Sequence, residues 1–115
     1  MSERKLDGRV AIVTGAAGGL GAESARVLAM HGASVAITDI DLDGARKVAA
    51  EIESGGGRAI AVRADVSSEA DVAAMVAAVV DRFGRVDVLY SNAAILSVEQ
   101  RQRDLMDVLS KSWDL

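Results

Sequence analysis

The chain contains no cysteine, no proline and a single histidine. The missing cysteines exclude a disulfide framework, a thiolate metal site and a cysteine nucleophile. A lone histidine without a cysteine partner argues against a transition-metal site, so we expect no metal. Aromatic residues make up only 3% of the sequence, which means that aliphatic side chains must build the core.

Long apolar runs and an excess of basic residues are also missing. The longest uninterrupted apolar stretch, residues 72–80, is far shorter than the ~20 residues that a membrane span needs. The first residues lack the apolar core of a signal peptide. A net charge of −4 argues against nucleic acid or a membrane surface as a partner. These absences predict a cytoplasmic protein.

Short β-branched runs alternate with stretches of helical length along the chain. They predict strands at residues 9–14, 34–39, 58–63 and 86–90, with helices between them at 19–31, 42–54 and 68–83. This alternation is typical of right-handed βαβ units around a parallel sheet. We expect one α/β domain, residues 1–115, with four strands. Half of a TIM barrel has the same alternation, so the loops must decide between the two.

The ends of two predicted helices carry recognisable signals. Ser68 and Asp71 have the spacing of a capping box at the start of the third helix, and Gly84 closes it. His31 ends the first helix, where we expect an interaction with the helix dipole rather than catalysis.

A glycine-rich turn, residues 14–21 (TGAAGGLG), follows the first strand and precedes a helix. A phosphate group needs backbone N–H donors at close range, and only residues without a bulky side chain allow that approach. The spacing differs from G-x-G-x-x-G, because Ser24 stands where the last glycine would be, and no P-loop lysine follows. The simpler alternative is a turn that only packs a helix tightly against a strand.

Asp39 ends the second strand, 18 residues beyond Gly21. A carboxylate there can accept both hydroxyls of an adenosine ribose. It would repel a 2′-phosphate, and neither Ala17 nor Ile40 supplies a compensating cation, which favours NAD over NADP. Asp39 could instead be the N-cap of the following helix.

Polar residues also follow the third and fourth strands, at Asp65 and Asn92. Ligands of open α/β sheets bind outside the carboxyl ends of the strands. The glycine turn, Asp39, Asp65 and Asn92 all fall on that edge, and this coincidence is stronger evidence than any single motif. Alternatively, Asp65 could cap the helix at Ser68, and Asn92 could be a structural turn residue.

These motifs, in this order, resemble the N-terminal half of a short-chain dehydrogenase/reductase. The resemblance covers residues 7–115 and implies a Rossmann-like doubly wound parallel sheet with strand order 3-2-1-4, truncated before the family's remaining strands. Its departures are Ala94, where the family usually has glycine, and Ser91, where asparagine is common.

The resemblance also implies how the site residues are used. The turn would hold the pyrophosphate of NAD, Asp39 the adenosine ribose and the third-strand loop the adenine. Asn92 would brace the central strands, and Ala93 would pass near the cofactor ribose. The implied cofactor-binding residues are Gly15, Gly19, Leu20, Gly21, Asp39, Asp65, Val66, Asn92 and Ala93.

The catalytic residues of that family are absent. Its chemistry uses a serine, a tyrosine and a lysine four residues after the tyrosine. Tyr90 is the only tyrosine and is followed at that distance by Ala94, so no Tyr-x-x-x-Lys exists and Tyr90 is interpreted as a strand residue. We expect no catalytic residue in this chain, no activity alone, and an open fourth strand that invites self-association.

Three functions remain open from the sequence. The favoured one is the NAD-binding portion of an oxidoreductase that moves hydride between NAD(H) and an alcohol or ketone. The second is a truncated dinucleotide-binding protein without turnover. The third is an S-adenosylmethionine-dependent methyltransferase, which normally has an acidic residue just before the glycines, where this chain has Val13 and Thr14.

Overall fold

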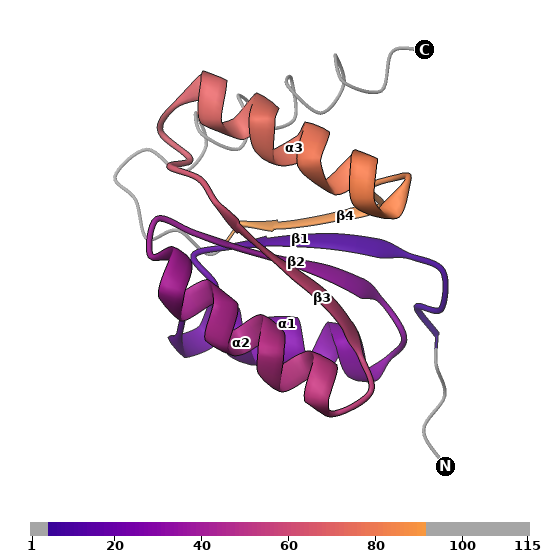
Figure 1. Cartoon of the computed structure of the whole chain (residues 1–115). Coiled ribbons are helices and arrows are strands. Elements are labelled where there is room, and N and C mark those ends of the chain that lie inside the picture. The colour runs from indigo at the N-terminus through magenta and orange to yellow at the C-terminus, as the bar shows by residue number, and fades with distance from the viewer. Residues whose placement is uncertain (1–4, 92–115) are drawn as a thin grey trace.

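Every β-branched run of the sequence contributes a strand to one parallel sheet (Figure 1). The computed structural model describes residues 5–91. The strands lie in the order β3-β2-β1-β4, which confirms the doubly wound topology. They are β1 (Val10–Thr14), β2 (Ser34–Asp39), β3 (Arg58–Arg63) and β4 (Val88–Ser91).

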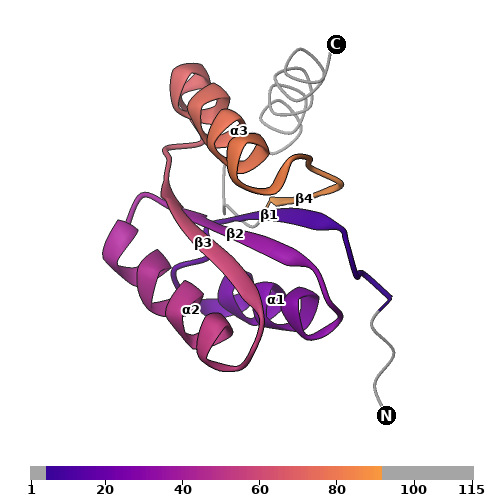
Figure 2. The ribbon, with the colours of Figure 1, turned by 45° about the vertical axis from the view of Figure 1, so that its right-hand side comes forward.

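Helices cover both faces of the sheet. Helices α1 (Gly19–Met30) and α2 (Leu42–Ser54) lie on one face, and α3 (Glu69–Phe83) lies on the other (Figures 1 and 2). Strand side chains alternate between two aliphatic cores, with Val13 among α1 and α2, and Ile12 beside α3. No helix in the described part of the chain is long and apolar enough to cross a membrane.

The strand register brings the carboxyl ends together at one edge, named here the carboxyl edge. Thr14 of β1 pairs with Thr38 of β2 on one side and with Ser91 of β4 on the other. Asp39 is level with Arg63 of β3. The loops after β1, β2 and β3 therefore open side by side at this edge, as the sequence predicts.

Strand β4 begins at Val88, so the prediction of a strand from residue 86 was wrong at its start. Val86 is buried in the core beneath α3 instead. Asp87 makes two bonds to Val10, because its N–H donates to the Val10 carbonyl at 2.8 Å and its carboxylate accepts the Val10 N–H at 2.9 Å. The Asp87 side chain thus accepts the Val10 N–H, which in a regular ladder would bond to a strand carbonyl. Strand β1 starts at Val10, not at residue 9 as predicted.

The helix ends confirm one expected cap and correct another. Gly84 adopts a left-handed conformation, φ +86°, and ends α3 as predicted. Ser68 accepts the Asp71 N–H at 3.2 Å, but the Asp71 carboxylate accepts the Asp65 N–H at 3.0 Å instead of reaching back to Ser68. Only half of the expected capping box forms. Helix α1 ends at Met30, and His31 is its C-cap.

Candidate functional site

The chain turns sharply between β1 and α1, at the carboxyl edge. Gly15 and Gly19 have φ values of +63° and +59°, which side chains with a Cβ adopt only under strain. Ala16 is buried and donates its N–H to the Thr38 carbonyl at 3.1 Å, which fixes the turn to the end of β2. The glycines thus allow a strand to feed directly into a helix.

The amino end of α1 has no side-chain cap. Its N-cap is Gly18, whereas α2 is capped by Asp41 and α3 by Ser68. A Cβ added at Gly18 or Gly19 would meet nothing within 4 Å. Gly18, Gly19 and Leu20 are exposed, so this end of α1, which carries the positive end of the helix dipole, is open to solvent, an arrangement suited to a phosphate group.

The Asp39 carboxylate lies against this turn. One of its oxygens accepts the Ala17 N–H at 3.0 Å, and the other accepts the Asp41 N–H at 3.0 Å. The N-cap of α2 is Asp41, whose side chain accepts the Gly44 N–H at 3.0 Å. The alternative interpretation of Asp39 as the helix cap is therefore wrong, and the structure brings this carboxylate to the glycine turn.

Asp65 follows β3 and lies in the next loop along the same edge. Its carboxylate accepts the backbone N–H of Ser67 at 2.9 Å and the hydroxyl of Ser67 at 2.6 Å. Ser68 caps α3, so Asp65 is not the helix cap either. Ala64 donates its N–H to the Asp39 carbonyl at 3.2 Å, which joins the two loops.

The predicted site residues thus gather as expected, as far as the structure describes them. At the carboxyl edge, Asp39 ends β2, residues 15–21 follow β1, and Asp65 and Val66 follow β3. Asn92 and Ala93 lie outside the described residues. Sequence reasoning missed Gly18 as the N-cap, although the lack of a serine, threonine, aspartate or asparagine just before α1 signals an open helix end.

Two buried threonines lie beneath the carboxyl edge, on the side of the sheet that α3 covers. The Thr14 hydroxyl bonds the Ser91 hydroxyl at 3.5 Å. The Thr38 hydroxyl is also buried, but has no hydrogen-bond partner among the described residues. These neighbouring strands therefore carry the same side chain in two different hydrogen-bonding states.

Asp87 lies at the opposite end of the strands, directly before β4, and no sequence pattern marks it as a functional residue. Its side chain is 10% exposed and pairs with Arg85 at 2.6 Å and with Arg9 at 3.6 Å. Burial raises the pKa of this carboxyl, but the Val10 N–H and the two arginines lower it more, and the net pKa is below its ordinary value. These contacts indicate a role in joining β1 to β4.

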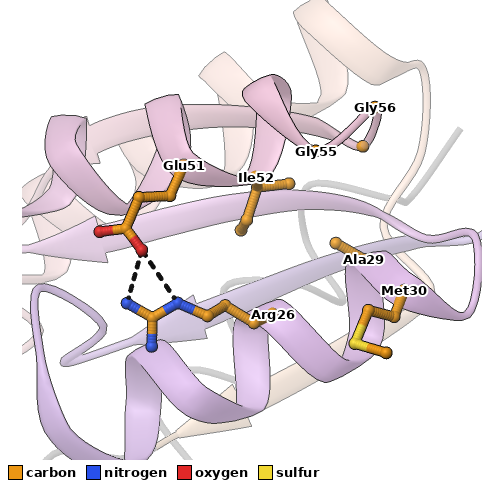
Figure 3. Close-up of a pocket in the computed structure, with 8 residues that line it drawn as sticks. Arg26, Ala29, Met30, Glu51, Ile52, Gly55 and Gly56 are labelled. Atoms are coloured by element: carbon orange, nitrogen blue, oxygen red, sulfur yellow. Dashed lines mark hydrogen bonds and ion pairs between the residues drawn. The ribbon is translucent and has the colours of Figure 1, made fainter.

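A cavity of about 450 Å³ lies between α1 and α2 (Figure 3). Arg26 and Glu51 form an ion pair across it at 3.0 Å, with Ala29 and Ile52 among the apolar lining. Residues 55–57, which directly precede β3, line its far end. The cavity is therefore separate from the carboxyl edge. No group of histidine and acidic residues within residues 5–91 could hold a metal ion.

Comparison with known proteins agrees with this geometry. Residues 9–114 match the family model of the short chain dehydrogenases. The 7alpha-hydroxysteroid dehydrogenase of Escherichia coli strain K12 is 44% identical over 89 residues, which cover 77% of this chain and 35% of that protein. The sorbitol dehydrogenase of Cereibacter sphaeroides is 38% identical over 110 residues, which cover 96% of this chain and 40% of that protein.

Solved structures show the same relationship. A 7 alpha-hydroxysteroid dehydrogenase complexed with NADH and 7-oxo glycochenodeoxycholic acid superposes with a TM-score of 0.86 at 32% identity, covering 95% of this chain and 49% of that one. The chain thus spans about half or less of the length of these relatives. The match decides against the methyltransferase alternative. The chain belongs to the short-chain dehydrogenase family.

Proposed function

We propose that this chain is the NAD-binding portion of an oxidoreductase, folded as one domain over residues 1–115. The observation that carries the proposal is the uncapped amino end of α1 beside the Asp39 carboxylate. The open N–H groups suit the pyrophosphate of a dinucleotide, and the carboxylate suits the hydroxyls of its adenosine ribose. The NADH bound to a relative of the same fold supports the choice of cofactor.

Asp39 has the hydrogen-bonding capacity that this role requires. An ionised carboxylate offers about four acceptor positions, and the Ala17 and Asp41 N–H groups occupy two of them. Both ribose hydroxyls can therefore donate to Asp39 without displacing the bonds that hold the turn. A 2′-phosphate would place negative charge against the same carboxylate, and Ala17 and the exposed Ile40 offer no cation to offset it. The site should select NAD over NADP.

The remaining assignments complete the proposed cofactor site. The turn would contact the pyrophosphate, the Asp65 loop would contact the adenine, and Asn92 and Ala93 would lie toward the nicotinamide ribose. The residues proposed to bind the cofactor are Gly15, Gly19, Leu20, Gly21, Asp39, Asp65, Val66, Asn92 and Ala93.

NAD(H) bound here would exchange hydride with an alcohol or ketone. The role of this chain's own residues is to bind and orient the dinucleotide, because the 115 residues contain no Tyr-x-x-x-Lys for proton transfer. We propose that the chain alone binds dinucleotide without turnover, and that the substrate binds only together with a further part of the enzyme. Relatives named for a hydroxysteroid and for sorbitol share an alcohol as substrate.

The substitution Asp39→Ala tests the proposal. We expect NAD binding to weaken and the preference for NAD over NADP to shrink, as measured by titration with both cofactors. Asp41→Ala is the matched control, since it removes the cap of α2 at a cost of about 0.5–2 kcal/mol in stability but leaves its N–H bonded to Asp39. If Asp39→Ala retained full selectivity, the ribose site would have to lie elsewhere.

A further inference from the structure

Strand β3 forms the edge of the sheet opposite β4. Figure 1 shows β3 crossing the front of the molecule, with α2 below it and α3 above it. Its only strand neighbour is β2, so the backbone groups that face away from β2 have no ladder partner within residues 5–91. This edge can accept another strand.

A hollow of about 370 Å³ lies against this edge. Apart from Ile60 and three charged residues, its lining side chains are small, with Ala49 and Ala50 contributed by α2 and Ala59 and Ala61 by β3. Because they are small, an extended chain can approach close enough for backbone hydrogen bonds, which need a strand separation of about 4.8 Å. The hollow therefore has the form of a strand-binding groove.

Arginines flank the groove on both faces of the sheet. Arg46 of α2 and Arg82 of α3 both line it, and Arg58 begins the strand, whereas Arg63, which ends it, pairs with Asp71 at 3.7 Å. This concentration of positive charge contrasts with the net charge of −4 of the chain. Arg46 remains 66% exposed and is only loosely paired with Asp43, at 3.8 Å. Its guanidinium is accessible to a second carboxylate.

Charged residues on an edge strand also prevent strands of the same kind from adding. Two copies of β3 placed side by side would bring their arginines together, so a second copy of this chain is a poor occupant. The same charges favour a strand that carries carboxylates, and a charge-complementary partner gains both backbone and side-chain contacts.

We propose that β3 is a docking site for an extended acidic segment of a partner protein, which adds to the sheet as a further strand. The two arginines approach the groove from opposite faces. Successive side chains of a strand point to opposite faces, so the carboxylates that reach Arg46 and Arg82 must be an odd number of residues apart.

The direction of the two helices limits how far apart the two carboxylates of the docked segment can be. Helix α2 starts after the carboxyl end of β2, so Arg46 lies toward that end of the groove, whereas Arg82 in the last turn of α3 lies toward the other end. Glu53 lines the groove on the α2 side, two turns further along α2 than Arg46. A second carboxylate on the α2 face would meet Glu53. A spacing of three residues places the carboxylates on opposite faces and separates them along the groove, whereas a spacing of two places both on one face.

The test uses the full chain and three labelled eight-residue peptides. All three have a background of valine and threonine. The first carries two glutamates at positions i and i+3 (the three-apart peptide), and the second carries them at i and i+2. The third has lysines in place of the glutamates of the first. Fluorescence anisotropy measures binding, and NMR amide shifts locate it. We expect the three-apart peptide to bind most tightly, to shift β3 amides and to weaken with salt.

Variants of the arginines complete the test. Arg46→Gln and Arg82→Gln should each weaken the three-apart peptide about two- to fivefold, as expected for an exposed ion pair. Arg26→Gln is the matched control, because Arg26 lies between α1 and α2, pairs with Glu51 and does not line the groove, and it should leave peptide binding unchanged. Equal binding of the two acidic peptides, shifts away from β3, or no binding would overturn the proposal. Shifts of β3 amides with protein concentration alone would identify a second copy as the occupant and would also overturn it.

Discussion

At the residue scale, two threonines at the carboxyl edge differ in whether their hydroxyl groups are hydrogen-bonded. Thr14 and Thr38 are register partners on adjacent strands, and both are fully buried. The Thr14 hydroxyl has a partner in Ser91, but the Thr38 hydroxyl has none among the described residues. A buried polar group that lacks a hydrogen bond costs about 1–3 kcal/mol. The two hydroxyls should therefore contribute to stability with opposite signs.

Valine has nearly the shape of threonine without the hydroxyl, so it isolates this effect. We expect Thr38→Val to raise the free energy of unfolding by about 1 kcal/mol, and Thr14→Val to lower it by a similar amount. Urea denaturation followed by circular dichroism measures both changes. A loss of stability in Thr38→Val would show that its hydroxyl is hydrogen-bonded in solution.

At the scale of the elements, the junction of β1 and β4 depends on Asp87. The lowered pKa of this carboxyl means that its ionised form stabilises the folded state. This contribution is complete above the unfolded pKa of about 4. It is lost as the pH falls through the lower, folded pKa. Asp87 should therefore stabilise the sheet at neutral pH and weaken it in acid.

We expect Asp87→Asn to lower the free energy of unfolding by about 1.5–3 kcal/mol at pH 7, because hydrogen bonds to an ionised group are lost. Denaturation at pH 7 and at pH 3 measures the free energy of unfolding of both proteins. The difference between the variant and the unchanged protein should be smaller at pH 3. Asp43→Asn is the control, since the Asp43 side chain is 91% exposed. An equal loss at both pH values would contradict the role of the charge.

The same junction shows where sequence reasoning reaches its limit. Local patterns were sufficient for β2, α2 and β3, whose predicted bounds are those of the structure. The start of β4 depends on a bond between Asp87 and Val10, which are 77 residues apart, and no local pattern contains that contact. For the site, the polar residues at the strand ends were sufficient to predict that Asp39 lies near the glycine turn. The bond from Ala17 to Asp39 required the packed structure.

At the scale of the whole molecule, β4 is the second open edge of the sheet within the described residues. Tyr90 is 40% exposed there, and no charged side chain occurs in the strand. We propose that the 115-residue chain self-associates through this edge. Sedimentation should show a mass that rises with concentration.

A lysine placed on the edge tests this association. Tyr90→Lys should shift the chain toward the monomer, because an exposed lysine blocks strand addition. Val27→Lys, at an exposed position of α1, should leave the association unchanged. A monomer at every concentration would contradict the proposal.

The bond between Asp87 and Val10 also bears on the order in which the chain folds. Neighbouring strands β1 and β2 close a loop of about 24 residues, whereas β1 and β4 close one of 77. Closing the longer loop costs about 1 kcal/mol more in chain entropy. As the chain leaves the ribosome, β1, β2 and β3 can pair before β4 has been synthesised. The boundary between β1 and β4, where the strand order reverses, is then the last of the three strand pairings to form.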